Sequence, residues 1–157
     1  MGRGIHLTID EWFYHWFSDE TKYLDAVRFF VRILEICDKI ALKKNSRLAH
    51  KFYQLDEDSG RWAPGQRNAV KFIKNAFLAN SEKIFWIEDD QNFSEAINEK
   101  LPRKDIYIVE ICFQTKDKIF ITTDTTLYNN IDSLKNELAI SPFLAKDFIH
   151  KYLSGEI

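Results

Sequence analysis

The sequence predicts one α/β domain, a three-layer αβα sandwich with a central, mostly parallel sheet of four or five strands. Short runs of β-forming residues alternate with helical segments along the chain, which is typical of a parallel sheet covered on both faces. A length of 157 residues fits a single domain, here residues 1–157. A content of 45% hydrophobic and 15% aromatic residues supplies the core that such a domain needs.

The strands are predicted from short apolar or alternating runs that end at polar residues. The first run alternates apolar and polar side chains and stops at Asp10, and the fourth run leads into Asp124. The last run is brief and indicates an edge strand. The five expected strands cover residues 5–9, 39–42, 84–87, 118–123 and 139–142.

The helices are predicted from apolar residues at helical spacing and from capping residues. Ser46 is the expected cap of the second helix, and Asn92 or Ser94 that of the fourth. Residues 56–60 are expected to form an exposed loop. The expected helices cover residues 21–39, 46–54, 66–79, 94–101, 105–115 and 143–153. The first is expected to bury Tyr23, Leu24, Val27, Phe30, Val31, Leu34 and Cys37.

Charge and cysteine content exclude few functions. A net charge of −2 gives no overall attraction to nucleic acid, so an RNA partner would need local basic patches. Two such patches are Lys43, Lys44 and Arg47, and Arg67, Lys71 and Lys74, although charge runs are more often solvated faces. The cysteines, Cys37 and Cys112, lack the spacing of a zinc or redox pair and are expected to be buried free thiols.

No apolar stretch of the sequence reaches the length of a signal peptide or of a membrane span. We therefore expect no membrane partner and a cytoplasmic location.

Five aromatic residues follow Asp10 in quick succession: Trp12, Phe13, Tyr14, Trp16 and Phe17. One buried helix face cannot accommodate this density, so some of them are expected to be exposed. Exposed aromatic rings stack on bases or form protein interfaces, and the interface is the favoured interpretation.

Acidic residues end two of the predicted strands. The carboxyl ends of parallel strands meet at one edge of a sheet, so Asp10 and Asp124 are expected to lie near each other. Asp105 opens a helix instead, and periodicity leaves open whether it reaches the same edge. Each acid has a structural alternative, as a helix cap or as a charge in a first helical turn.

The segment DIYIVEICFQTKDKIFITTDTTL, residues 105–127, resembles the C-terminal signature of PIN (PilT N-terminal) domains. The matches are Asp105 opening a helix, Cys112 as the small residue near its end, a strand, and then Thr122-Thr123-Asp124. The segments IHLTID and ELAISPFLAKDFIHKYL resemble the first strand and the last strand and helix of that family. These pieces cover about a third of the chain.

The resemblance implies a metal-dependent endoribonuclease that cleaves single-stranded RNA. It implies that Asp10, Asp105 and Asp124 hold Mg²⁺ or Mn²⁺, hard cations that select oxygen ligands. The metal would activate a water, and Thr122 would orient the site through a hydrogen bond. Family members often form homodimers or bind an inhibitor protein, such as the antitoxin of a toxin, so these partners are expected beside RNA.

The sequence departs from the family at one position. PIN domains usually carry a further acid on the helix after the second strand, where this chain has His50 and Lys51. Glu110 and Glu11 are the candidate substitutes. Two alternatives remain open: a catalytically degenerate module that binds RNA or a protein, and, less favoured, a receiver-like phosphate-binding domain, for which Lys146 is poorly placed.

Overall fold

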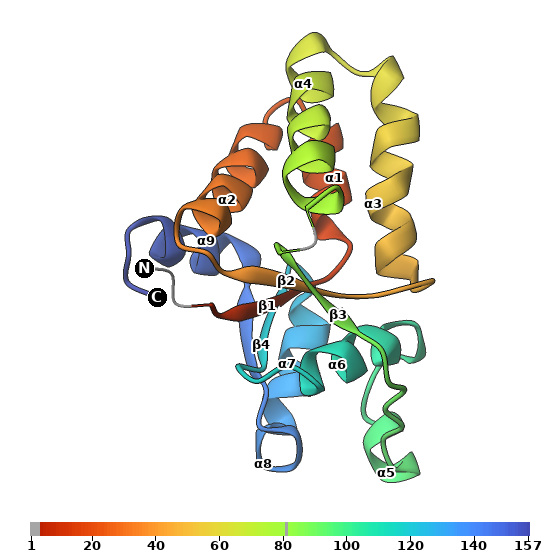
Figure 1. Ribbon diagram of the computed structural model, residues 1–157. Helices are drawn as coiled ribbons and strands as arrows, with labels where there is room; N and C mark the ends of the chain where they lie inside the picture. Colours follow the sequence, from red (N-terminus) through yellow and green to blue (C-terminus); the bar gives the residue numbers. More distant parts are fainter. Residues whose placement is uncertain (1–3, 81) are drawn as a thin grey trace.

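The computed structural model describes residues 4–80 and 82–157, and these residues contain one five-stranded sheet. The strands are hydrogen-bonded in the order β3-β2-β1-β4-β5, and every neighbouring pair is parallel. Helices flank both faces, so the predicted fold class is confirmed (Figure 1). The strands are β1 His6–Ile9, β2 Lys39–Lys43, β3 Ile84–Ile87, β4 Ile119–Thr122 and β5 Ser141–Leu144.

The helices form two layers (Figure 1). One face of the sheet carries α1 Trp12–Ser18, α2 Tyr23–Glu35, α3 Arg47–Asp58, α4 Pro64–Ile73 and α9 Ala145–Leu153. The other face carries α6 Ile106–Phe113 and α7 Thr125–Ser133. Shorter elements are η1 Ser59–Arg61, η2 Lys74–Leu78, α5 Glu95–Asn98, η3 Arg103–Asp105 and α8 Lys135–Leu138. None of the helices within the described residues has the length and apolar character needed to cross a bilayer.

Strand β1 lies at the centre of the sheet. Leu7 is in register with Ile40 of β2 on one side and with Ile119 of β4 on the other. The chain adds β2 and β3 on one side of β1 and later adds β4 and β5 on the other side. The strand order therefore reverses between β1 and β4, and in open α/β sheets ligands bind beside the carboxyl ends of strands at such a reversal.

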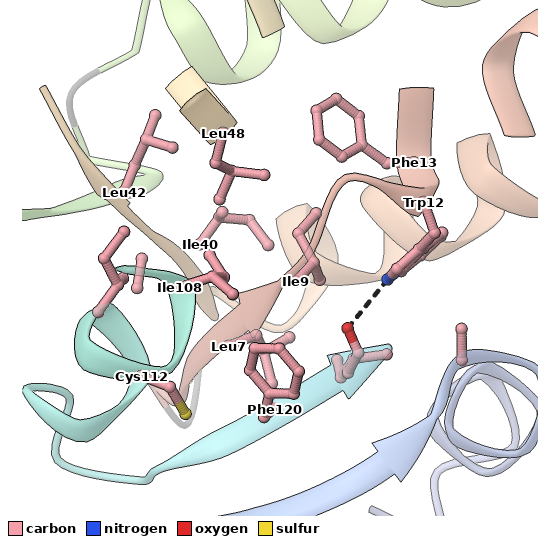
Figure 2. Packing of buried hydrophobic residues seen from close by; sticks show 14 of the residues in the cluster. Leu7, Ile9, Trp12, Phe13, Ile40, Leu42, Leu48, Ile108, Cys112 and Phe120 are labelled. Atoms are coloured by element: carbon pink, nitrogen blue, oxygen red, sulfur yellow. Dashed lines mark hydrogen bonds between the residues drawn. The ribbon is translucent and has the colours of Figure 1, made fainter. Parts of the chain in front are cut away.

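The core on both faces is built from side chains that alternate along the central strands (Figure 2). Leu7, Ile9 and Phe120 have no solvent exposure. Each fully buried side chain of this size stabilises the fold by about 1.5–3 kcal/mol relative to exposure. Burial also raises the pKa of the Cys112 thiol to about 12, which keeps it protonated, and Cys112 is buried as expected.

The aromatic segment after Asp10 forms helix α1, and the expectation that some of its aromatic rings are exposed is wrong. Trp12, Phe13 and Phe17 are buried, and Tyr14 and Trp16 are half-buried. The reason is that α1 packs against α2, α3 and α4 at once, so more than one of its faces is covered.

Helix α2 buries a face that overlaps the predicted one only at Phe30. Ala26, Phe29, Phe30 and Ile33 are the buried residues, whereas Leu24 is 51% exposed. The helix is apolar on several sides, and only the neighbouring helices decide which side faces the core. Beyond its end, Cys37 is exposed, which contradicts its expected burial.

One loop differs from its expected bounds. The predicted loop at residues 56–60 is instead the end of α3 followed by η1, because the helix continues to Asp58. Ser46 caps α3 by accepting a hydrogen bond from the Ala49 amide at 3.2 Å, as expected. Ser94 likewise caps α5.

A buried carboxylate fastens the start of β1 to the last helix. Asp38 has no solvent exposure. Its Oδ1 accepts from the Ile5 amide at 2.9 Å, and its Oδ2 accepts from the Tyr152 hydroxyl at 2.7 Å. Segments 114 positions apart in sequence are thus held together at the amino end of the central strands.

Candidate functional site

The candidate site lies at the carboxyl ends of β1 and β4, where the strand order reverses. Ile9 is in register with Ile121, so Asp10 lies beside Thr122. The Asp10 amide extends the ladder by donating to the Ile121 carbonyl at 3.3 Å. Trp12 contacts the same carbonyl, because its indole Nε1 donates to the oxygen at 3.0 Å (Figure 2).

Thr122 connects two of the predicted acids. Its hydroxyl donates to Asp10 Oδ2 and accepts from the Asp124 amide at 3.0 Å. Thr122 is itself fully buried. The hydroxyl therefore fixes both the Asp10 carboxylate and the turn that carries Asp124.

Asp10 is held in an environment that disfavours its charge. Burial raises its pKa to about 6, and the nearby negative charges of Asp105 and Glu11 act in the same direction. The hydrogen bonds from Thr122 and from the Trp12 amide, the latter at 3.1 Å, lower the pKa but do not offset burial. A neighbouring cation would relieve this cost.

Asp124 caps helix α7, which is the structural role considered as the alternative for this residue. Its Oδ1 accepts from the amides of Thr126 at 2.9 Å and Leu127 at 3.1 Å. Capping does not exclude a second role, since a carboxylate has two oxygens and four lone-pair sites.

Asp105 lies at the junction of η3 and α6 and reaches the same edge. Burial raises its pKa, Lys104 and Arg47 oppose this shift, and the charges of Asp124 and Glu11 add to it. Its Oδ2 is buried and has no hydrogen-bond partner among the described residues. A buried carboxylate oxygen without a partner is costly, which makes it a natural point of attachment for a ligand or ion.

Arg47 enters the site from the first turn of α3. Its Nε donates to Glu11 Oε1 at 2.7 Å, and its Nη2 donates to the Lys104 carbonyl. The guanidinium carbon lies 4.9 Å from the centre of the Tyr107 ring, and the Tyr107 hydroxyl also donates to Glu11 Oε1 at 3.3 Å. Glu11, one candidate substitute for the missing acid, is thus already paired with Arg47.

The other residues considered at the sequence level lie away from the three acids. Glu110 faces a hollow that Lys43 and Asp90 also line, and burial raises its pKa while Lys43 lowers it. His50 is exposed, and the Lys51 ammonium lies 4.9 Å from the Tyr14 ring centre.

The acids do not form a preassembled cage. Within residues 4–80 and 82–157, no group of three or more His, Cys, Asp or Glu side chains is arranged to hold a metal ion. The donor chemistry nonetheless suits a hard divalent cation, because the acids offer only oxygen ligands and Asp105 has a buried unpaired oxygen.

Sequence reasoning placed Arg47 in a charge run that is more often a solvated face and otherwise contacts phosphates, and did not place it in this site. Its position carries a usable signal: it follows the cap Ser46 directly after β2, so it must lie at the carboxyl edge of the sheet. A cation at that edge is a natural partner for Glu11.

Comparison of the sequence with protein-family models, with curated proteins and with solved structures finds no match. A function for the chain is therefore inferred from the geometry of the acidic edge and from the sequence resemblance.

Proposed function

We propose that the chain is a PIN-like endoribonuclease that uses Mg²⁺ or Mn²⁺ to cleave single-stranded RNA. The observation that carries the proposal is the acidic edge at the strand reversal, where Asp10 has a pKa raised to about 6 and Asp105 has a buried oxygen without a partner. Both features favour an added cation over the bare carboxylates.

Asp10, Asp105 and Asp124 would hold the cation in this proposal. When bound, the ion lowers the pKa of a water and stabilises charge on a phosphate oxygen. Other residues of the chain position the acids. Thr122 orients Asp10 through its hydroxyl, and the α7 amides hold Asp124 in place.

The test is cleavage of a labelled single-stranded RNA with Mn²⁺ by the wild type and by Asp124→Asn. Asparagine caps helices as well as aspartate, so the variant removes the charge and keeps the helix start. We expect the rate to fall by at least about 100-fold, the scale of losing one metal ligand or transition-state contact.

Asp132→Asn is the matched control, since it removes an exposed carboxylate from the same helix, and it should cleave at the wild-type rate. Equal traces of cleavage by wild type and Asp124→Asn would mean that a contaminant cuts the RNA and would sink the nuclease proposal.

The second candidate function is a non-catalytic module that binds RNA or a protein partner. The Glu11–Arg47 ion pair favours it, because a guanidinium inside the acidic edge supplies positive charge that a nuclease would take from its metal.

Arg47→Ala tests whether the guanidinium competes with the metal ion. Removing the guanidinium frees Glu11 and removes a repelling charge, so we expect Mn²⁺ to bind about tenfold more tightly, measured by calorimetry. Lys51→Ala, an equal charge change on the same helix, should leave the affinity unchanged. An Arg47→Ala protein that binds Mn²⁺ no better than wild type would show that Arg47 does not compete with the ion.

A further inference from the structure

Two hollows open beside the acidic edge, where β2 ends. The first has a volume of about 380 Å³ and is bounded by Arg47 and Tyr107. The second has a volume of about 430 Å³ and is bounded by Trp86 at the end of β3. Lys43, Lys44 and Asn45 line both hollows, which together we call the β2-end groove.

Each hollow combines an aromatic wall with a cation. Arg47 lies over the Tyr107 ring in the first, and the Lys44 ammonium lies 6.0 Å from the Trp86 ring centre in the second. Single-stranded nucleic acids are bound by this combination, because bases stack on aromatic rings while cations follow the phosphates. Each hollow lies within the size range of ligand pockets, which start near about 300 Å³.

The charges in the groove leave Lys44 available to a ligand. Lys43 is paired with Asp90, and it also donates to the Asp89 carbonyl at 3.3 Å. Lys44 is exposed and forms no ion pair with any residue in the described part of the chain. Polar side chains in the first hollow, Gln91, Glu110 and Gln114, offer donors and acceptors to base edges.

Arg47 joins the groove to the acidic edge. It lines the first hollow, and its Nε contacts Glu11, the residue next to Asp10. The first hollow and the acidic edge are therefore neighbours that share Arg47.

We propose that the β2-end groove binds two consecutive nucleotides of single-stranded RNA. One base lies against Tyr107, the next lies against Trp86, and Lys44 contacts the phosphate between them. The proposal rests on the proposed function in taking RNA as the ligand, and it adds the place where RNA is held beside the acids.

The test is binding of fluorescein-labelled octauridylate by anisotropy in EDTA, where metal-dependent cleavage is stopped. We expect Lys44→Ala to weaken binding roughly fivefold and to reduce the slope of log K against log salt by about 0.7, the value for one phosphate contact in a single strand. Trp86→Leu should weaken binding roughly tenfold and leave the slope unchanged, because it removes only stacking.

Lys71→Ala is the matched control, since it removes one lysine charge from the basic patch on α4, and it should bind as wild type does. Three results would each overturn the groove proposal. They are equal losses of RNA affinity in Lys44→Ala and Lys71→Ala, wild-type affinity in both groove variants, and equal affinity for an RNA duplex. Absence of RNA binding by the wild type would also overturn it and leave the groove to a protein ligand.

The two proposals fail separately. Binding that depends on Lys44 and Trp86 without any cleavage in Mn²⁺ supports the groove and overturns the nuclease. Cleavage that depends on Asp124, with RNA affinity unchanged in both groove variants, overturns the groove alone.

Discussion

Asp10→Asn is expected to stabilise the protein by about 2–3 kcal/mol at pH 8 and to abolish RNA cleavage. The folded state raises the pKa of Asp10 from 3.8 to about 6. One pKa unit corresponds to about 1.4 kcal/mol, so the ionised carboxylate costs the folded state about 3 kcal/mol at pH 8. Asparagine keeps the shape of the side chain and can bond to both Thr122 and the Trp12 amide, but it is never charged.

The stability gain of Asp10→Asn depends on pH. Because the folded state binds the Asp10 proton more tightly than the unfolded state does, this residue disfavours folding progressively as pH rises from about 4 to about 6, and fully above that range. Urea unfolding in EDTA should therefore show a gain for Asp10→Asn at pH 8 and almost none at pH 4. Asp132→Asn should show no gain at either pH. A destabilised Asp10→Asn protein at pH 8 would contradict the burial argument.

Asp38→Ala is expected to lower the free energy of unfolding by about 2–6 kcal/mol, because it removes the acceptor of two buried donors. The change leaves the Ile5 amide and the Tyr152 hydroxyl without this acceptor in the interior. Each unpaired buried group costs about 1–3 kcal/mol. Urea unfolding at pH 7 measures the effect.

Tyr152→Phe provides the graded comparison for Asp38. It removes the hydrogen bond from the Tyr152 hydroxyl to Asp38 and keeps the packed ring. The free energy of unfolding should therefore fall by less, about 1–2 kcal/mol. An Asp38→Ala protein within 1 kcal/mol of wild type would show that water replaces both contacts.

The strands were predictable because a parallel sheet leaves a local signature, short apolar runs that stop at polar residues. The helices were harder to orient. In α2 the residues Leu24 and Phe29 are equally apolar, yet only Phe29 is buried. In α1 the surrounding helices cover faces that a solvated helix would expose. Local periodicity shows that a helix forms but not how many elements surround it.

The acidic edge was predictable to the extent that strand topology specifies it. Asp10 and Asp124 follow adjacent strands, so their proximity follows from the fold class. The pairing of Glu11 with Arg47 depends instead on the packing of α3 against α1 and β2, across 36 positions of sequence. No local pattern encodes a contact of this kind.

The central position of β1 also affects how the chain acquires its shape during synthesis. Residues 6–9 gain their partner on one side from β2, but the partner on the other side, β4, begins only at residue 119. A growing or truncated chain that ends after β3 therefore presents the apolar edge of β1, which invites pairing with other chains. Such a chain also has Asp10 and Glu11 but lacks Thr122 and Asp124, so a complete acidic edge arises only when the last third of the protein has been made.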